Sequence, residues 1–286
     1  MIHLKYKKMN KTIKHIINAK TILLSSFLLV VVFVITSCDP DETQTVATFN
    51  NLVMSDEFDT DGAPNPELWG NWIGTAFNNE LQYYTDRPEN ITVQNGVLII
   101  SAKKEDFNGS SYTSARIESK GLFEQKHGRF EARMRLPYGK GLWPAFWLLG
   151  ADIDSKPWPN CGEIDILEYL GDEPSTIFGT VHGPGYSGVK SISKSYELTN
   201  DRFDTGFHVF GIEWGPKYIN YYVDDVLYNQ ITPEDVPGEW VFDNGPFYII
   251  INLAVGGDLP GSPNAETVFP QTLLVDYVRV YTNGSN

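Results

Sequence analysis

The sequence predicts an all-β sandwich, and three of its features support this fold class. Between Leu52 and Tyr281, short runs rich in β-branched and aromatic residues alternate with Gly, Pro, Asn and Asp. Few stretches have helical periodicity, and the best of them, Thr232–Val236, is one turn at most. With 286 residues, 42 % hydrophobic and 13 % aromatic, the chain can build one large core. We therefore expect a single domain of two packed sheets over residues 51–286.

The expected strands follow one another at short intervals along this region. Examples are Ile91–Val93, Val97–Ala102, Ala115–Ser119, Arg129–Leu136, Ala145–Leu149, Phe207–Trp214, Tyr218–Val223, Phe247–Leu253 and Leu274–Tyr281. Turn-forming pairs separate several of them, at Asn95-Gly96, Asn108-Gly109, Tyr138-Gly139 and Gly256-Gly257. No long repeat, coiled coil or second domain is indicated.

The first 37 residues have the pattern of a bacterial lipoprotein signal. Residues 1–20 carry six Lys and no acid, and the apolar run at 21–35, 15 residues long, is short for a transmembrane helix. Small residues then precede Cys38, which resembles the acylated cysteine of a lipobox, and Met9 is an alternative start. We expect a signal peptide at 1–37, an acidic tether at 38–50 and a lipid anchor at Cys38. The expected location is the cell-surface side of the outer membrane, with secretion as the alternative.

Charge and cysteine content exclude several classes of partner. The leader holds six of the 22 basic residues and none of the 36 acids, so the mature chain has a net charge of −20. Such a surface repels nucleic acid, anionic lipid and sulfated polysaccharide, and it is indifferent to a neutral polysaccharide.

The chain has two cysteines, Cys38 and Cys161. If Cys38 carries lipid, Cys161 has no partner for a disulfide, and we interpret it as a buried structural residue rather than a nucleophile. The domain is expected to be a monomer.

One stretch, Gly162 to Glu168, concentrates three acids in six residues. In a strand, alternate side chains share a face, so Glu163 and Asp165 point to one side and Ile164 to the other. Strict alternation would put Glu168 among the apolar residues. A β-bulge at Ile166-Leu167 restores the parity and returns Glu168 to the side of the other acids. The alternatives are a solvated acidic face and a calcium-binding strand.

Two close glutamates on a rigid strand suit glycoside hydrolysis. One carboxylate attacks the anomeric carbon while the other protonates the departing oxygen. We assign Glu163 as nucleophile, Glu168 as acid/base and Asp165 as the partner that shares a proton with the nucleophile. Three crowded carboxylates cannot all ionise cheaply, so we expect one or more raised pKa values.

Aromatic residues gather around this stretch, as a sugar site requires. Sugar rings stack their C–H faces on aromatic rings and need polar partners for their hydroxyls. Trp143 and Trp158 are expected in the cleft, whereas Trp147 fits cleft and core equally well. The candidate polar partners are Asn78, Arg116, His182 and Asn252. A zinc site is not indicated, because no second His lies at ligand spacing from His182.

The acidic stretch, read as E-x-D-x-x-E, resembles the bulged signature of glycoside hydrolase family sixteen in its laminarinase-like branch. The resemblance extends over most of Phe49–Tyr281. It is carried by the segments beginning at Asn78 (NNELQYYT), Tyr112 (YTSAR), Gly141 (GLWPAFW), Trp158 (WPNCG), His182 (HGPGYSG) and Val275 (VDYVRVY). One departure is Phe77, where relatives often carry Gly.

This resemblance implies a concanavalin-like jelly roll of two curved antiparallel sheets with a concave catalytic cleft. It implies a retaining endo-hydrolase of β-1,3-glucans, with mixed-linkage β-1,3/1,4-glucan as the alternative and a non-catalytic glucan-binding lipoprotein as a third hypothesis. By similarity, the sugar subsites are lined by Asn78, Arg116, Trp143, Trp158 and His182. No cofactor is needed for catalysis. A structural Ca²⁺ is implied at Asp276 and the backbone carbonyls of Glu57 and Gly96.

Overall fold

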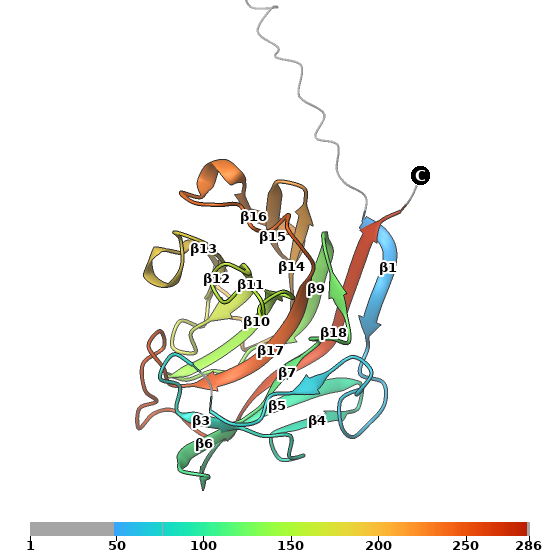
Figure 1. Cartoon of the computed structure of the whole chain (residues 1–286). Coiled ribbons are helices and arrows are strands. Elements are labelled where there is room, and N and C mark those ends of the chain that lie inside the picture. Colours follow the sequence, from blue (N-terminus) through green and yellow to red (C-terminus); the bar gives the residue numbers. More distant parts are fainter. Residues whose placement is uncertain (1–48, 76, 285–286) are drawn as a thin grey trace, which may run out of the picture. The chain divides into compact units, whose positions relative to one another are not determined.

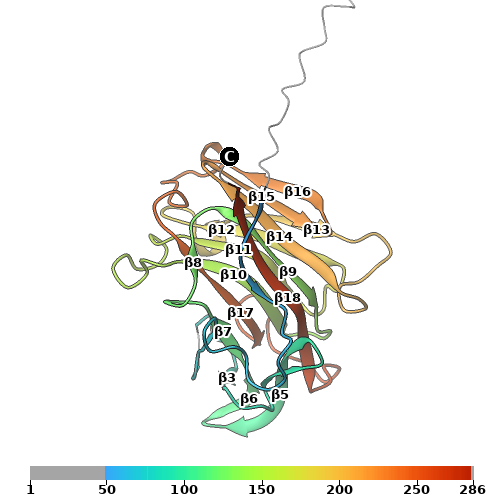
Figure 2. The ribbon, with the colours of Figure 1, turned by 90° about the vertical axis from the view of Figure 1, so that its right-hand side faces the viewer.

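A computed structural model describes residues 49–75 and 77–284, and in this part of the chain almost all regular structure is β-strand. Figure 1 shows the strands stacked in two layers, and Figure 2 turns the layer of β9, β14 and β18 toward the viewer. The predicted leader and most of the predicted tether lie outside the described residues. Within the described residues, no helix has the length and apolar character needed to cross a membrane.

The first sheet has its strands in the spatial order β16-β15-β14-β9-β18-β5-β6-β3, while β1 also pairs with β18 and β4 with β5. Their bounds are β1 Phe49–Asp56, β3 Gln82–Tyr84, β4 Ile91–Gln94, β5 Val97–Phe107, β6 Ser110–Ser114, β9 Gly128–Arg135, β14 His208–Gly215, β15 Tyr218–Val223, β16 Val226–Ile231 and β18 Gln271–Asn283. All its pairs are antiparallel except β3 with β6, which is parallel. The expectation of antiparallel sheets is therefore correct apart from this edge.

The second sheet has the order β13-β12-β11-β10-β17-β7-β2, and β8 also pairs with β17. Its strands are β2 Gly70–Asn71, β7 Arg116–Glu118, β8 Glu124–Gln125, β10 Leu142–Gly150, β11 Glu163–Tyr169, β12 Thr176–His182, β13 Ile192–Glu197 and β17 Phe247–Val255. Two 3₁₀ turns complete the described elements, η1 (Gly188–Lys190) and η2 (Pro233–Asp235), the second inside the single helical turn expected from the sequence.

The main core lies between the two sheets. Alternate residues of neighbouring strands meet there, and Phe146, Ile164, Phe210 and Ile251 are all fully buried. In the second sheet, the residues next to Phe146, Ile164 and Ile251 in sequence point away from this core, to a side that we call the outer face. A smaller apolar cluster of Leu149, Cys161, Tyr248 and Ile250 lies apart from the main core.

The domain begins slightly earlier than expected. β1 starts at Phe49, inside the range predicted as tether, because Phe49 and Asn51 already pair with Asn283 and Thr282 of β18. The two ends of the described chain are thus held side by side in the first sheet.

Candidate active site

The predicted bulge is present in β11 and has the predicted effect. On β10, Ala145 lies opposite Glu168, Phe146 opposite Leu167 and Trp147 opposite Asp165. One step on β10 therefore matches two steps on β11, and Ile166 is the extra residue.

The bulge sorts the side chains between the two faces of the sheet. Ile164, Ile166 and Leu167 are buried in the main core. Glu163, Asp165 and Glu168 lie opposite outer-face positions of β10, so all three acids share the outer face.

His182 lies beside two of these acids, as expected of a residue directly opposite Glu163 in β12. Its Nε2 lies 3.6 Å from Glu163 Oε1 and 3.3 Å from Asp165 Oδ2. The backbone N–H of Gly188 donates to Nδ1 at 3.1 Å. Because Nδ1 accepts a hydrogen bond, a neutral imidazole carries its proton on Nε2, directed at the carboxylates. Gly188 thus fixes the tautomer that suits the acids.

Burial dominates the electrostatics of the three acids. It raises the pKa of Glu163 well above the usual value, the Asp165 charge adds to the rise, and His182 opposes it. Burial also raises the pKa of Asp165 well above its usual value, and the nearby Glu168 charge acts in the same direction. The pKa of Glu168 is raised by burial and held down by His182, Thr180 and Trp143. The group therefore retains protons above the usual range, as a general acid requires.

Thr180 is a site residue that the sequence reasoning missed. This buried side chain donates from Oγ1 to Glu168 Oε2 at 3.3 Å, and its Oγ1 lies 2.8 Å from Ser193 Oγ. A hydroxyl both donates and accepts, so Thr180 can serve Glu168 in both protonation states. Its position two residues before His182, on the same face of β12, was the available signal.

The tryptophans expected at the sugar site lie around the acids. Trp143 is on the outer face, and its indole helps to hold down the pKa of Glu168. Trp158 is 44 % exposed, and its ring centroid lies 5.8 Å from that of His182. Its indole likewise opposes the rise in the pKa of Glu163. Both tryptophans therefore border the acids with part of a ring available to a sugar.

Trp147, which the sequence left undecided between cleft and core, is on the outer face. Its Nε1 donates to Asn252 Oδ1 at 2.8 Å. The guanidinium carbon of Arg116 lies 4.9 Å from the Trp147 ring centroid. The predicted residues Trp147, Asn252 and Arg116 thus form one contiguous wall across β10, β17 and β7.

Another carboxylate, Glu80, is half-buried beside this wall and was not predicted. It accepts hydrogen bonds from Gln82 Nε2 at 2.6 Å and from Tyr84 Oη at 3.1 Å. Burial raises the pKa of Glu80, while these two hydrogen bonds and the Arg116 charge lower it. Tyr84 Oη in turn accepts a hydrogen bond from Asn252 Nδ2 at 3.3 Å, so Tyr84 connects Glu80 to Asn252 of the wall.

Asn78 reaches the site through a close approach of two loops. The Asp258 N–H donates to the Asn78 carbonyl at 2.9 Å. Between them Gly257 has φ +118°, and an added Cβ would lie 3.0 Å from the Asn78 carbonyl oxygen and 3.6 Å from the Trp143 ring. Only glycine fits this passage without strain. The predicted residues Asn78 and Trp143 are therefore neighbours.

Cys161 is not part of the chemistry. Its side chain is buried, and burial raises the pKa of its thiol to about 11. A thiol that stays protonated at neutral pH is a poor nucleophile. This agrees with the structural role expected from the sequence.

Among the described residues, one group of side chains could hold a metal ion, and the predicted calcium residues are a separate candidate. Glu163, Asp165 and His182 offer ligand atoms within 4.8 Å of one another, but these are the groups of the acid cluster itself. The predicted calcium residues lie together at β18, where Asp56 pairs with Val278 and Leu98 with Val275. Glu57 follows β1 and Gly96 precedes β5, so these registers place both backbones near Asp276, between the parts of β18 that pair with β1 and with β5.

Both carboxylates at this place are paired with arginines. Asp276 occupies an irregularity of β18 and accepts from Arg133 at 2.6 Å. The carboxylate of Glu57 is engaged by Arg279, which leaves its backbone carbonyl for a cation. A carboxylate with two carbonyl oxygens is a set that a hard cation accepts.

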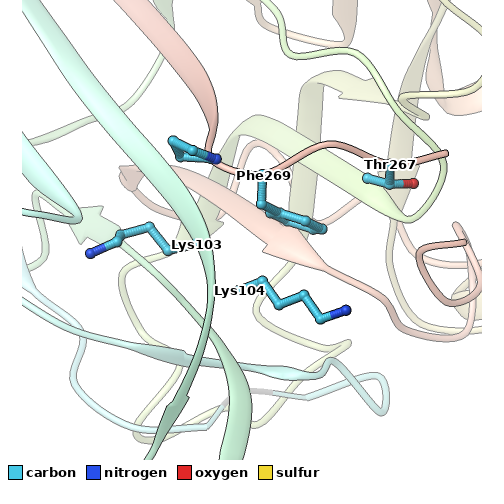
Figure 3. A pocket seen from close by; sticks show the side chains of 5 residues that line it. Lys103, Lys104, Thr267 and Phe269 are labelled. Atoms are coloured by element: carbon cyan, nitrogen blue, oxygen red, sulfur yellow. The ribbon is translucent and has the colours of Figure 1, made fainter. Parts of the chain in front are cut away.

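A separate pocket lies outside the acid cluster. It is lined by Lys103, Lys104, Thr267, Phe269 and Pro270. Figure 3 shows Lys103 and Lys104 leaving β5 on opposite sides, with Phe269 near them. β5 belongs to the first sheet, and none of the five residues that line this pocket belongs to the site on β11.

The sequence matches the family described as glycosyl hydrolases family 16 over residues 78–277. It is 44 % identical over 242 residues to a beta-glucanase of Rhodothermus marinus, covering 80 % of this chain and 84 % of that protein. An endo-beta-1,3-glucanase structure from Pyrococcus furiosus superposes with a TM-score of 0.78 at 49 % identity, covering 82 % of this chain and 95 % of the other. The laminarinase catalytic domain from Thermotoga maritima superposes equally well, at 46 % identity, with 82 % and 99 % covered.

Proposed function

The chain belongs to glycosyl hydrolases family 16, and we propose that it cleaves β-1,3-glucosidic bonds within laminarin-type glucans with retention of configuration. The observation that carries this proposal is the bulge at Ile166, which turns Glu163 and Glu168 to one face of β11. The relatives with the same fold are named beta-glucanase, endo-beta-1,3-glucanase and laminarinase, which supports the substrate.

The two glutamates act in two displacement steps. Glu163 attacks the anomeric carbon while Glu168 gives its proton to the departing glycosidic oxygen, and a glycosyl ester forms on Glu163. Glu168, now ionised, takes a proton from water, and the water attacks the same carbon and releases Glu163. Asp165 and His182 Nε2 lie 3.3 Å apart beside Glu163 and orient it.

The substrate class follows from the chemistry of the outer face. Tryptophan rings stack on sugar C–H faces, while Asn78 and His182 offer polar partners. The net charge of the whole sequence, −14, favours a neutral polysaccharide over a sulfated one. Laminarin is the first choice and mixed-linkage glucan the second, so digesting laminarin, barley glucan and agarose side by side tests the assignment. Faster release of reducing ends from agarose would refute it.

The catalytic assignment is tested by Glu163→Gln and Glu168→Gln. Each variant should fold normally and lose laminarin cleavage by orders of magnitude. Azide should rescue Glu163→Ala and give an α-glycosyl azide, whereas a β-azide would move the nucleophile role to another residue. Proton NMR of the first product should show the β-anomer, and an inverted product would contradict the double displacement.

A non-catalytic glucan-binding role is the competing hypothesis. A binding protein of this fold has no use for two carboxylates with raised pKa values on one strand. Reducing-end release from laminarin separates the two roles directly. Tight laminarin binding without release would favour the binding protein.

We also propose that Cys38 is acylated and that the domain works at the outer surface of a bacterial outer membrane, as a monomer. The support is the basic and apolar leader followed by Cys38 and an acidic segment. Labelling cells with an alkyne fatty acid should mark the wild-type chain and not Cys38→Ser. Equal labelling of both would refute the anchor.

A structural Ca²⁺ at Asp276 completes the proposal. Its support is the register that brings the Glu57 and Gly96 backbones beside that carboxylate. A chelator should lower the melting temperature of the wild type and leave that of Asp276→Asn unchanged. If chelation has no effect on the wild type, the site does not bind calcium.

A further inference from the structure

A row of side chains crosses the outer face from the acid/base residue to the far edge of the second sheet. Glu168 lies opposite Ala145, Ala145 opposite Asn252, and Asn252 opposite Arg116. The Trp72 N–H donates to the Arg116 carbonyl at 3.0 Å, so the row continues to Trp72, the residue that follows β2. At about 4.8 Å for each strand, Trp72 lies roughly 19 Å from Glu168. The row is long enough for several sugar units.

Arg116 joins two aromatic rings in this row. Its guanidinium carbon lies 4.9 Å from the Trp147 ring centroid and 5.0 Å from that of Trp72. The Arg116 side chain is 7 % exposed, with the carboxylate of Glu118 at 3.5 Å. A cation held between two ring faces fixes both rings, so Trp72 is kept in line with Trp147.

Phe77 extends the row beyond Trp72. The two ring centroids lie 6.2 Å apart, at 50°. Phe77 is 64 % exposed, and the neighbouring Ile73 is 51 % exposed. These side chains leave an apolar surface open at the edge of a sugar-binding face, where the next unit of a bound chain would pass.

We propose that Trp72 and Phe77 form a distal sugar subsite that takes a glucosyl unit several positions away from the scissile bond. The ligand is the same neutral β-glucan, so this inference rests on the proposed function. Continuity with the Trp147 and Arg116 wall argues for the glucan rather than for a protein partner. The rings offer a stacking surface, as sugar C–H faces require.

The subsite predicts a dependence on chain length. A short oligosaccharide occupying the positions next to Glu163 and Glu168 does not reach Phe77, whereas a long one does. A stacking contact of this kind changes affinity by roughly fivefold to tenfold. The subsite therefore favours long chains and internal cleavage.

The test compares Phe77→Ala with the wild type on β-1,3-gluco-oligosaccharides of increasing length and on laminarin. We expect kcat/KM to fall about fivefold to tenfold for laminarin and the longest oligosaccharides, and to stay unchanged for the shortest. Phe77→Tyr keeps the ring and should restore the wild-type values. Val268→Ala, which removes another exposed apolar side chain (69 % exposed), is the matched control and should have no effect.

Two results would overturn the subsite: an equal loss at every length, or no loss at any length. If the wild type leaves laminarin intact, the proposed function fails instead. Calorimetric binding of the same oligosaccharides to wild type and Phe77→Ala still decides the subsite in that case. Weaker binding of the long chains alone supports it, and equal binding at all lengths rejects it.

Discussion

Deleting Ile166 should remove the bulge and keep the three acids on the outer face. Without this residue, Asp165, Leu167 and Glu168 still lie opposite Trp147, Phe146 and Ala145, but with no irregularity. The registry with β12 also becomes regular, because Asp165 and Glu168 then match Thr180 and Phe178 step for step. The strand would read E-x-D-x-E.

The cost of this deletion can be worked out from the structure. Ile166 is 2 % exposed in the main core, and the loss of a buried Ile side chain costs about 2–5 kcal/mol. For a domain of this size that corresponds to a fall in melting temperature of roughly 4–20 °C. A displacement of about 1 Å in the acids lowers the rate about 10²-fold. We therefore expect a folded variant with kcat/KM on laminarin about 10²-fold below wild type.

Deletion of Ile164 is the matched control, since it removes the same residue type from the same strand. Ile164, a core residue, is part of the regular alternation and is not the extra residue of the bulge. Its deletion therefore shifts Glu163 by one position, which turns Glu163 toward the core and leaves the outer face without its nucleophile. This variant should be no more active than Glu163→Gln. An Ile166 deletion that is folded by circular dichroism and yet no more active than the Ile164 deletion would refute this role of the bulge.

Three further predictions concern buried polar groups. Burial raises the pKa of Glu163, so the folded wild type loses stability relative to the unfolded chain as the pH rises above about 4.5. Glu163→Gln lacks this titration and should melt a few degrees higher than wild type at pH 7 and at the same temperature at pH 4. Calorimetry that shows no gain at pH 7 would contradict this. Thr180→Val removes a hydroxyl that holds down the pKa of Glu168, so the basic limb of the pH profile of kcat/KM should move to higher pH. Thr180→Ser keeps the hydroxyl and should leave this limb in place. An unmoved basic limb in Thr180→Val would exclude the proposed effect of Thr180 on Glu168. Cys161, whose thiol has a pKa of about 11, should resist iodoacetamide at pH 8 in the native protein and react after unfolding, and fast native labelling seen by mass spectrometry would show that it is accessible.

The catalytic strand could be predicted from the sequence because its information is local. The parity of Glu163, Asp165 and Glu168 against Ile164 and Leu167 required one extra residue, and the structure contains it. The nine strand ranges named from the sequence also overlap strands of the structure, because they combine alternation with bounding turn residues.

Glu80 could not be predicted in the same way, because the connection that gives it a role reaches a residue distant in sequence. Glu80 acquires its role only when Tyr84 and Gln82 fold back beside Asn252, 172 positions away from Glu80. The parallel pairing of β3 with β6 likewise joins segments that are separated in sequence. Nothing in a single sequence reports a contact of that kind, apart from the polar character of the residues themselves.

The acids and the proposed sugar-binding residues are held in place by different parts of the structure. The acids, the bulge and His182 lie on two adjacent strands, β11 and β12, whose registry the core fixes through Ile164 and Leu167. The wall of Trp147, Asn252 and Arg116 lies on β10, β17 and β7. It is held by the Arg116 guanidinium and by a hydrogen bond, and Trp72 contacts the same guanidinium. Substitution of Phe77 in the proposed distal subsite should therefore change the binding of long glucan chains and leave the carboxylates in place.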